Sequence, residues 1–411
     1  MARIRRTTHL FFSFEDVLFF DIPLLLRRTA ALKPLKQILA FSVLTGREYA
    51  VNMRTLQILF DIPSDIWTLD RDIVEKRRIE LSFVEELARK GLILSDHHDR
   101  ELSELRKKDE LLSSTQWNKY ASLYHYMGKW KDMHLRDNLP ENAEQFGEIN
   151  TTSEDTFRQF VARYGKPPGH FHTIPNPLEI HDLPLIKKEG DLYRTLTNRK
   201  TTRAFDPGTP MTLNELSVIL YYVYGCHGYA PVFEDIVRLK KTSPSGGGLH
   251  PTEVYPLIIN VAELDPGIYH YNVKNHRLDL IVGVSEDEAR ELANESTAGQ
   301  SYPRWAHALF IMTARFYRHS WKYRRHPRSY SVLAMDVAHL SQSFYLVCTD
   351  LGLGAFITAA INAINIEQRL GLDGVTEGAV AVCGCGKVLE SNLDLDPEYF
   401  TYIPRETEIG D

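Results

Sequence analysis

A proline-rich run constrains the fold of this chain more than any other feature of its sequence. Residues 166–185 read KPPGHFHTIPNPLEIHDLPL and contain five prolines. Proline fixes its own backbone φ and carries no amide hydrogen, so this run cannot continue as a helix or as a regular sheet strand. It therefore predicts a linker or a wrapping arm between two folded parts. The length of 411 residues agrees, since one domain usually takes roughly 150 residues.

The part before the linker divides into two sections. Residues 1–110 are predicted to form a smaller, mostly helical domain, and residues 111–185 a helical segment followed by the linker. In the first section a strand at 49–51 precedes a helix over 53–60, and a helix that ends near Gly91 precedes another short strand. This order is the outline of a winged helix-turn-helix. A generic small helical domain is the alternative.

The part after the linker, residues 186–411, has the pattern of an α+β domain. Thr212 opens a helix with a capping box. Apolar, β-rich runs at 255–261 and 308–314 predict central strands, and a long helix is expected over 331–351 from its apolar spacing of four and three residues. Helical and strand segments that alternate in this way predict a sheet with helices packed against it.

Composition excludes several classes of protein. The chain has 48 basic and 54 acidic residues, a net charge of −6, and so offers no basic field for nucleic acid. Four cysteines are too few for a disulfide scaffold and fit a reducing compartment. No run of 18 apolar residues predicts a membrane span, and Glu15 and Asp16 interrupt the amino-terminal apolar stretch too early for a signal peptide. We therefore expect a soluble cytoplasmic protein.

A dense cluster of hydrogen-bond donors follows the linker in the run NRKTTRAF. It contains Arg199, Lys200, Thr201 and Arg203. Guanidinium groups, an ammonium and a hydroxyl are the side-chain donors that hold phosphate oxygens. A solvated basic turn is the alternative reading of this run.

A second candidate is the glycine-rich run SPSGGG. It contains Pro244, Ser245, Gly246 and Gly247, followed by a predicted strand. Glycines let the backbone approach a flat or anionic ligand closely. The run lacks the Lys-Ser/Thr of a P-loop and the spacing of a dinucleotide fingerprint. A flexible turn is the alternative.

A third candidate is the pair Lys322–Tyr323 in a cationic run just before the predicted long helix. Neighbouring cations favour the neutral amine of a lysine, which can then act as a general base. A solvated charge run is the alternative. On the long helix, Asp336, His339 and Gln342 could be metal ligands, but hydrogen bonding between elements is the favoured reading, and no metal site is predicted.

Together, and in this order, the three runs resemble the nitroreductase superfamily of FMN enzymes, and specifically its SagB-type branch. The basic run, the glycine-rich run, Lys322–Tyr323 and the pattern D-x-x-H-x-x-Q from Asp336 to Gln342 carry the resemblance, with Thr201 where the family usually has serine. It covers about residues 186–390. Members of the branch are azoline dehydrogenases that mature thiazole- and oxazole-containing peptides.

The resemblance implies a nitroreductase-like α+β fold, with a central mixed or antiparallel sheet flanked by helices, and a flavin site at a homodimer interface. It implies FMN as cofactor, with its phosphate on the basic run and its ring along the glycine-rich run. A further cation from the carboxy-terminal part, Lys387 or Arg405, would contact the phosphate, and this choice stays open. Lys322 and Tyr323 would be the catalytic acid–base pair.

The resemblance also implies oxidation of azoline rings to thiazoles or oxazoles in a ribosomally made peptide. The precursor peptide and cyclodehydratase proteins would be the partners, and residues 1–110 would bind the peptide. One alternative is an FMN-dependent NAD(P)H reductase of nitroaromatics or quinones, which would need no long amino-terminal extension. Another alternative is a non-catalytic protein that binds the peptide and whose flavin site has decayed. The retained motifs argue against this alternative.

Overall fold

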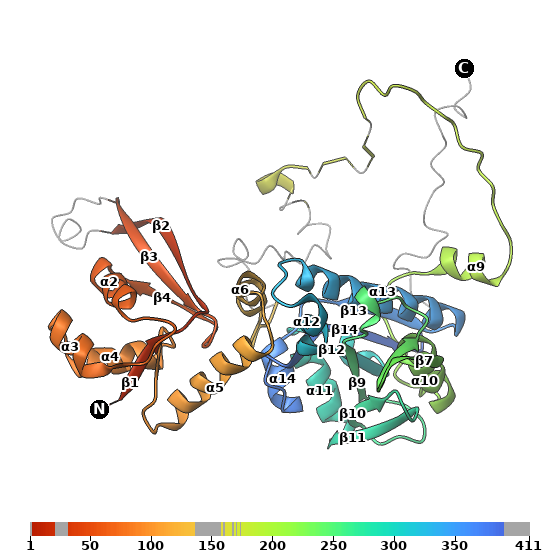
Figure 1. Cartoon of the computed structure of the whole chain (residues 1–411). Helices are drawn as coiled ribbons and strands as arrows, with labels where there is room; N and C mark the ends of the chain where they lie inside the picture. The colour runs from red at the N-terminus through yellow and green to blue at the C-terminus, as the bar shows by residue number, and fades with distance from the viewer. Residues whose placement is uncertain are drawn as a thin grey trace.

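A computed structural model describes residues 2–20, 32–135, 158, 161–166, 168–169, 171–172 and 174–389. It shows two bodies, a smaller amino-terminal one and a larger carboxy-terminal one, joined by α5 (Arg100–Ser114) and α6 (Lys119–Met127) (Figure 1). A long extended segment leads into α9 (Asp191–Asn198) on the second body.

The carboxy-terminal body is built on a six-stranded sheet in the order β11-β10-β9-β12-β14-β13. Every neighbouring pair is antiparallel, which confirms the predicted fold class. The strands are β9 (Thr252–Ile258), β10 (Gly267–Asn272), β11 (Arg277–Gly283), β12 (Ala308–Arg315), β13 (Gly354–Thr358) and β14 (Glu377–Gly386). A separate hairpin, β7 (Gly228–Phe233) and β8 (Ile236–Lys240), precedes them.

Helices cover both faces of this sheet. On one face lie α10 (Leu213–Ile219), its π-helical continuation over Leu220–Tyr224, and α13 (Ser329–Asp350). On the other face lie α11 (Glu286–Ser296) and α14 (Ala363–Leu370). A short helix, α12 (Phe316–Tyr323), connects β12 to α13. Because both faces are covered, the first seven residues of β12 are all buried, and all of them except Thr313 are apolar, so the strand does not alternate.

Two local predictions are confirmed in this body. Thr212 and Glu215 form the expected capping box of α10, and the helical segment ends at Gly225. The predicted long helix is α13, with Leu333, Val337 and Phe344 in the core. These signals depend on neighbours within one or two turns, so sequence alone reveals them.

The amino-terminal body contains more sheet than the predicted mostly helical domain. Its helices are α2 (Met53–Asp61), α3 (Asp70–Arg77) and α4 (Leu81–Arg89). Its strands are β1 (Arg3–Arg6), β2 (Leu10–Phe20), β3 (Leu32–Ser42), β4 (Arg47–Val51), β5 (Thr68–Leu69) and β6 (Ile93–Ser95). The hairpin of β2 and β3 was missed because charged residues and Pro34 interrupt the apolar alternation that marks strands.

The helix-turn-helix outline itself is present. Three residues separate α3 from α4, and β6 follows α4 directly, as the sequence predicted. The small sheet has the order β5-β1-β6, so the first strand of the chain lies between the two strands that flank the helices. The helices and this sheet share one core, which includes Ile4, Leu59, Val84 and Leu87.

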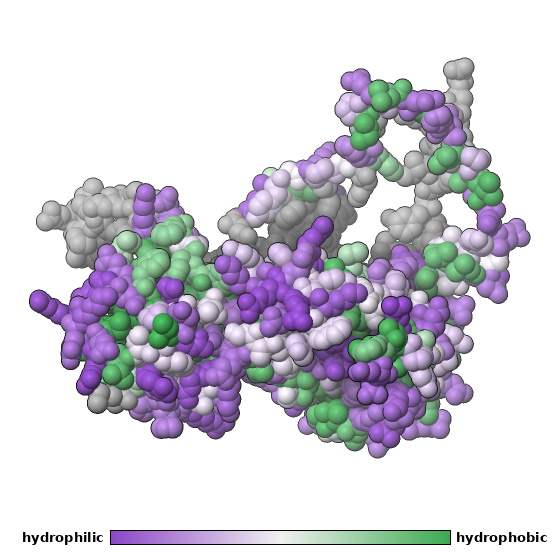
Figure 2. Space-filling model, viewed as in Figure 1, coloured by the Kyte–Doolittle hydropathy of each residue, from purple (hydrophilic) through white to green (hydrophobic). Residues whose placement is uncertain are grey.

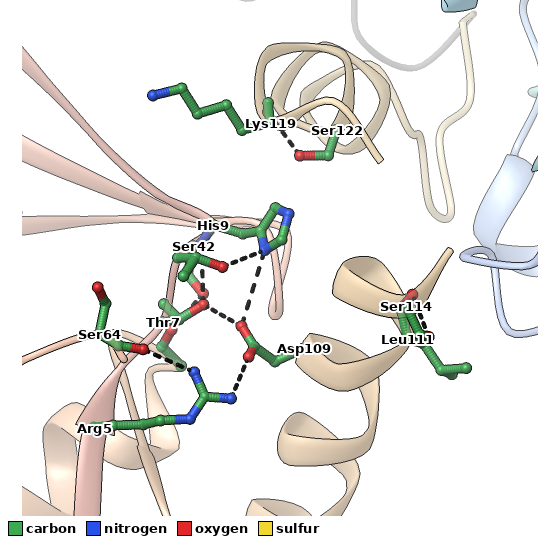
Figure 3. Close-up of polar contacts among 12 residues, drawn as sticks. Arg5, Thr7, His9, Ser42, Ser64, Asp109, Leu111, Ser114, Lys119 and Ser122 are labelled. Carbon is green, nitrogen blue, oxygen red and sulfur yellow. Dashed lines mark hydrogen bonds and ion pairs between the residues drawn. The ribbon is translucent and has the colours of Figure 1, made fainter. Parts of the chain in front are cut away.

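A buried carboxylate holds α5 to the start of the chain (Figure 3). Asp109, 1% exposed, accepts hydrogen bonds of 2.7 Å from Arg5 Nη2 and of 2.7 Å from Thr7 Oγ1. His9 Nδ1 lies 3.9 Å from the same carboxylate. Burial would raise the pKa of Asp109, but these hydrogen bonds and the charge of Arg5 outweigh it and lower the pKa.

Helix α6 packs directly on the carboxy-terminal body. Trp117, just before α6, lies 4.7 Å from the ring of Phe316, and its Nε1 donates 2.9 Å to the carbonyl of Val375. One buried cluster contains residues of both bodies, among them Leu112 and Leu333. The two bodies are therefore parts of one packed unit, and α6 belongs to the interface between them.

The proline-rich segment is extended, and residues 174–190 are fully on the surface. Figure 2 shows hydrophobic side chains along this arm, and they include Ile174, Leu178, Ile180 and Leu183. That the arm wraps around another surface stays a prediction. In the part of the chain that the structure describes, no helix has the length and hydropathy needed to cross a membrane.

Candidate functional site

The glycine-rich run forms a tight loop that α13 holds in place. Ser245 Oγ donates 2.6 Å to one carboxylate oxygen of Asp336, and the amide of Gly246 donates 2.8 Å to the other. The amide of His250 in turn donates 2.9 Å to Ser245 Oγ. Asp336 is therefore a hydrogen-bonding residue between elements, as the sequence favoured, and the described residues contain no cluster suited to a metal ion.

The loop lies directly against Lys322 and Tyr323. A Cβ at Gly247, whose φ is 65°, would lie 2.7 Å from Lys322 Nζ and 3.1 Å from Tyr323 Oη. A Cβ at Gly246 would collide with Val332. Lys322 Nζ also lies 3.5 Å from the carbonyl oxygen of Gly247. Glycine is thus required for this close approach, and the structure brings two of the three predicted runs together.

Lys322 and Tyr323 occupy the last turn of α12 rather than a loop before α13. The ring of Tyr323 lies 4.8 Å from that of His319, which is buried and donates 2.8 Å through Nε2 to the carbonyl of Ser329. Burial lowers the pKa of His319, so its ring is neutral.

The basic run packs against the start of β13 and the second half of α13. The amide of Thr202 donates 2.8 Å to the carbonyl of Ala355. A Cβ at Gly354 would lie 2.6 Å from Thr202 Cγ2, so this contact also requires glycine. The hydroxyls of Thr201 and Tyr345 are 3.0 Å apart. The backbone of the run is therefore fixed.

The two arginines of the run lie over aromatic rings. The guanidinium of Arg199 lies 5.3 Å from the centre of the Tyr345 ring, and that of Arg203 lies 5.6 Å from the centre of the Tyr302 ring. No described carboxylate pairs with Arg199, Lys200 or Arg203. Three cations without an acidic partner, beside the hydroxyl of Thr201, are suited to an anion such as a phosphate.

The predicted carboxy-terminal cation has another partner. Lys387 lies beside the basic run, since its carbonyl accepts 2.9 Å from the amide of Asp206. Its Nζ, however, forms a 2.5 Å ion pair with Glu215. Burial would raise the pKa of Glu215, but the hydrogen bonds of Lys387 and Thr212 lower it. Arg405 lies outside the described residues, so contact of either cation with a phosphate stays a prediction.

The basic run and the glycine-rich loop contact different parts of α13. Asp336 holds the loop and Tyr345 meets the basic run, nine residues farther along the helix. Nine residues correspond to about 14 Å along a helix axis and to opposite sides of the helix. One copy of the chain therefore does not gather all three runs around a single point.

The residues Glu253 and Tyr255, at the start of β9 just after the loop, are held in place by contacts within the sheet. Glu253 lies 3.4 Å from His270 Nε2 and 3.2 Å from Arg315 Nη1. Tyr255 Oη donates 3.1 Å to Glu377 Oε1. Burial is the main cause that raises the pKa of Tyr255, so this hydroxyl stays protonated. These contacts join β9, β10, β12 and β14 at one end of the sheet.

Sequence reasoning missed three residues that shape the site. The rings of Tyr345 and Tyr302 contact Arg199 and Arg203 of the basic run, and the His319 ring packs against that of Tyr323. All three lie far along the chain from the group they contact or are buried in a helix without a recognisable motif. Only a map of tertiary contacts reveals them.

In comparisons with known proteins, residues 196–387 match the model of the nitroreductase family. The trifolitoxin-processing protein TfxB of Rhizobium leguminosarum bv. trifolii is 31% identical over 220 residues, which are 52% of this chain and 58% of TfxB. A protein of Methanocaldococcus jannaschii that carries the name nitroreductase MJ1384 is 31% identical over 193 residues, 47% of this chain and 88% of that protein.

Among solved structures, a chain of the E. coli microcin synthetase McbBCD complex, with truncated pro-MccB17 bound, is similar with a TM-score of 0.46. It is 18% identical, and the match covers 71% of this chain and 99% of that one. The chain spans little more than half the length of TfxB, so the comparison with TfxB concerns one part of that protein.

Proposed function

Because the chain belongs to the nitroreductase family, we propose that it is an FMN-dependent dehydrogenase that oxidises azoline rings in a ribosomally made peptide. One observation carries the proposal, namely the contact of the glycine-rich loop with Lys322 and Tyr323. It places a candidate base and a phenol directly against the backbone of Gly247. The similarity to a trifolitoxin-processing protein supports a peptide as substrate.

The residues present fit a flavin mononucleotide. Arg199, Lys200, Thr201 and Arg203 supply donors for a doubly charged phosphate, with no described acidic side chain paired to these cations. The Cβ directions of Gly246 and Gly247 are occupied by Val332, Lys322 and Tyr323, whereas nothing lies within 4 Å of a Cβ placed at Gly248, so a flat ring would approach the open side of the loop at Gly248. When bound, the flavin would supply an acceptor for the hydrogen and the electron pair that the azoline loses.

The chain's own residues would handle the proton. Conversion of an azoline to an azole removes two hydrogens from adjacent ring atoms, and one of them leaves as a proton. Lys322 Nζ, in its neutral form, would accept that proton. The Gly247 carbonyl, 3.5 Å away, orients the amine, and Tyr323 would relay the proton or hold the ring nitrogen. The neutral His319 ring beside Tyr323 fixes the direction of the phenol.

We propose further that the complete site forms between two copies of the chain. The basic run and the loop are about 14 Å apart along α13 in one copy. The exposed residues of α13 are Ser331, Ala334, Met335, Ala338, His339 and Gln342, and the one exposed charged residue is Asp350 at the carboxy-terminal end of the helix. A helix side that stays in water normally carries charged residues. We therefore expect a second copy of the chain to pack on this side of α13. Its loop would then approach the basic run of the first copy.

A prediction tests the phosphate assignment. Arg199→Ala should remove a charge-assisted hydrogen bond of roughly 1.5–3 kcal/mol and weaken FMN binding by about ten- to a hundredfold. Arg194→Ala, which removes an exposed cation of α9 paired with Asp191, should bind FMN like the parent. Flavin fluorescence after dialysis measures both. An Arg199→Ala protein that keeps one flavin per chain would overturn the assignment.

The amino-terminal body is proposed to bind the precursor peptide, with cyclodehydratase proteins as further partners. A groove of about 190 Å³ lies between α4 and the strands β1 and β6. Leu81, Val84 and Ala88 supply apolar lining, Glu85 adds an acidic group, and Asp99 is paired with Arg89, which also lines the groove. Such a lining suits a peptide segment with apolar side chains.

Leu81→Glu should weaken binding of the precursor by roughly tenfold, because it places a charge at an apolar contact. Leu81 is 45% exposed, so the fold tolerates the change. Met53→Glu is the matched control, since Met53 is an exposed apolar residue of α2 outside the groove. Calorimetric titration with precursor measures both variants. Equal affinity of the Leu81→Glu protein and the parent for the precursor would contradict this assignment.

The rival within the family is an NAD(P)H-dependent reductase of nitroaromatics or quinones. It requires no amino-terminal body, yet residues of that body share a buried cluster with the carboxy-terminal body. Rapid NAD(P)H oxidation with a quinone, together with no reaction with azoline peptides, would favour this rival.

A further inference from the structure

A pocket of about 430 Å³ lies at the junction of the two bodies, outside the contacts described above. One wall comes from α6 and the residues that follow it, and includes Tyr124, His125 and Met127. The opposite wall comes from Tyr330 at the start of α13 and from small apolar residues of β14 and the β13–α14 connection. Pockets of this volume hold small organic groups.

The α6 wall is firmly fixed. Lys129 Nζ forms a 2.7 Å ion pair with Glu367, and both side chains are at most 8% exposed. Tyr126 Oη donates 2.9 Å to the carbonyl of Gly374. The amide of Met133, after the helix, donates 2.9 Å to Asn362 Oδ1. The pocket is therefore a preformed feature of the packed unit.

The pocket wall carries aromatic rings and no unpaired charge. His125 Nδ1 lies 3.0 Å from Tyr330 Oη, and its Nε2 lies 3.4 Å from the carbonyl of Gly374. A carbonyl can only accept, so Nε2 carries the proton and Nδ1 accepts from the tyrosine. Burial lowers the pKa of His125 well below its ordinary value. The charge of Lys129 is neutralised by Glu367, so the lining selects against ions.

Short contacts link the pocket to the basic run. Ala359, part of the lining, follows Thr358, whose Oγ1 accepts 3.0 Å from Gln300 Nε2. Tyr302 Oη donates 2.8 Å to Gln300 Oε1, and the Tyr302 ring lies beneath the guanidinium of Arg203.

A second set of contacts links the pocket to the candidate catalytic pair. Tyr330 follows Ser329, whose carbonyl holds the His319 ring against Tyr323. The pocket is therefore linked to both halves of the candidate site through chains of packed residues.

We propose that this junction pocket binds a neutral, flat ring of the peptide substrate next to the reacting azoline, with Tyr124 and Tyr330 as ring contacts. The inference rests on the proposed function and adds a specificity-determining subsite to it. Two rings share this chemistry, a heterocycle already formed in the peptide and an aromatic side chain beside it. Tyr124 is 71% exposed at the rim, where it can close over an entering ring.

The test uses the full-length, flavin-loaded protein and calorimetric titration with two neutral probes, 2-phenylthiazole and N-acetylphenylalaninamide. Thiazole-4-carboxylate serves as the charged probe. Tyr124→Ala should raise the dissociation constant of the better neutral probe by about tenfold, the effect of losing one ring contact and its buried area. Met127→Trp should abolish binding by filling the pocket. Tyr120→Ala, an exposed tyrosine of the same helix outside the pocket, is the matched control.

Saturable binding of a neutral probe that only the pocket variants weaken supports the inference, and the tighter probe identifies the kind of ring. Absence of saturable binding, tighter binding of the charged probe, or parental affinity in both pocket variants overturns it. The visible flavin band is recorded for each sample. A flavin-loaded protein whose pocket binds neither neutral probe refutes the subsite alone, whereas a protein that binds no flavin refutes the proposed function.

Discussion

Replacing Lys322 with alanine is expected to slow azoline oxidation by about 10²–10⁴-fold, the usual share of a general base, while the flavin stays bound. Lys322 Nζ lies beside Gly247 in the last turn of α12, whereas the basic run packs on the far half of α13. Loss of the amine should therefore affect proton removal rather than cofactor affinity. Single-turnover kinetics with an azoline peptide, together with the flavin spectrum, measure both effects.

Two further variants sharpen this result. Tyr323→Phe should be milder if the phenol only relays or orients the proton. Lys274→Ala removes an exposed cation of the β10–β11 turn, outside the cationic run, and should leave the rate unchanged, which separates a specific base from a general effect of charge. A Lys322→Ala enzyme with the parent rate would show that the pair belongs to a solvated charge run. Loss of flavin in that variant would instead assign Lys322 to cofactor binding.

Replacing Asp109 with alanine is expected to cost about 3–5 kcal/mol of stability, because it leaves Arg5 partly buried without its counter-charge. Urea unfolding followed by tryptophan fluorescence measures this loss. Glu104→Ala on the same helix is the matched control, since Glu104 forms an exposed pair with Arg100. Such pairs contribute about 0.2–1 kcal/mol. A loss of the control's size in Asp109→Ala would contradict the inferred role of this carboxylate.

The same carboxylate predicts a pH dependence. The folded state lowers the pKa of Asp109, so its contribution is complete above the ordinary carboxyl pKa of about 3.9. The contribution is lost as the pH falls through the lowered value. The stability difference between the parent and Asp109→Ala should therefore shrink in acid and stay constant near neutral pH.

Local signals explain most of what the sequence predicted about the fold. The capping box of α10, the apolar stripe of α13 and the glycine that ends α4 each act within a few residues. The hairpin of β2 and β3 depends on strand pairing, and the position of α6 depends on packing between distant segments. No local pattern in the chain specifies those contacts.

The candidate site shows the same division. The runs around Arg199, Gly246 and Lys322 were identified from their residue types and from resemblance, and the structure joins the last two. The pair Lys322–Tyr323 is expected in a cationic run just before the long helix, and the structure places it at the end of α12, a separate short helix. Tyr345 stayed unnoticed, because a core tyrosine in a helix carries no local mark of its contact with Thr201.

The central claim is that this chain removes hydrogen from an azoline peptide with a bound flavin, and anaerobic mixing tests it most directly. The cofactor is first released from a portion of the purified protein and identified as FMN. The rest of the protein is then mixed with an azoline-containing precursor in the absence of oxygen. We expect the visible band of the oxidised flavin to bleach in proportion to the azole formed, one flavin for each ring. A flavin that stays oxidised with this peptide but bleaches with NAD(P)H would contradict the account.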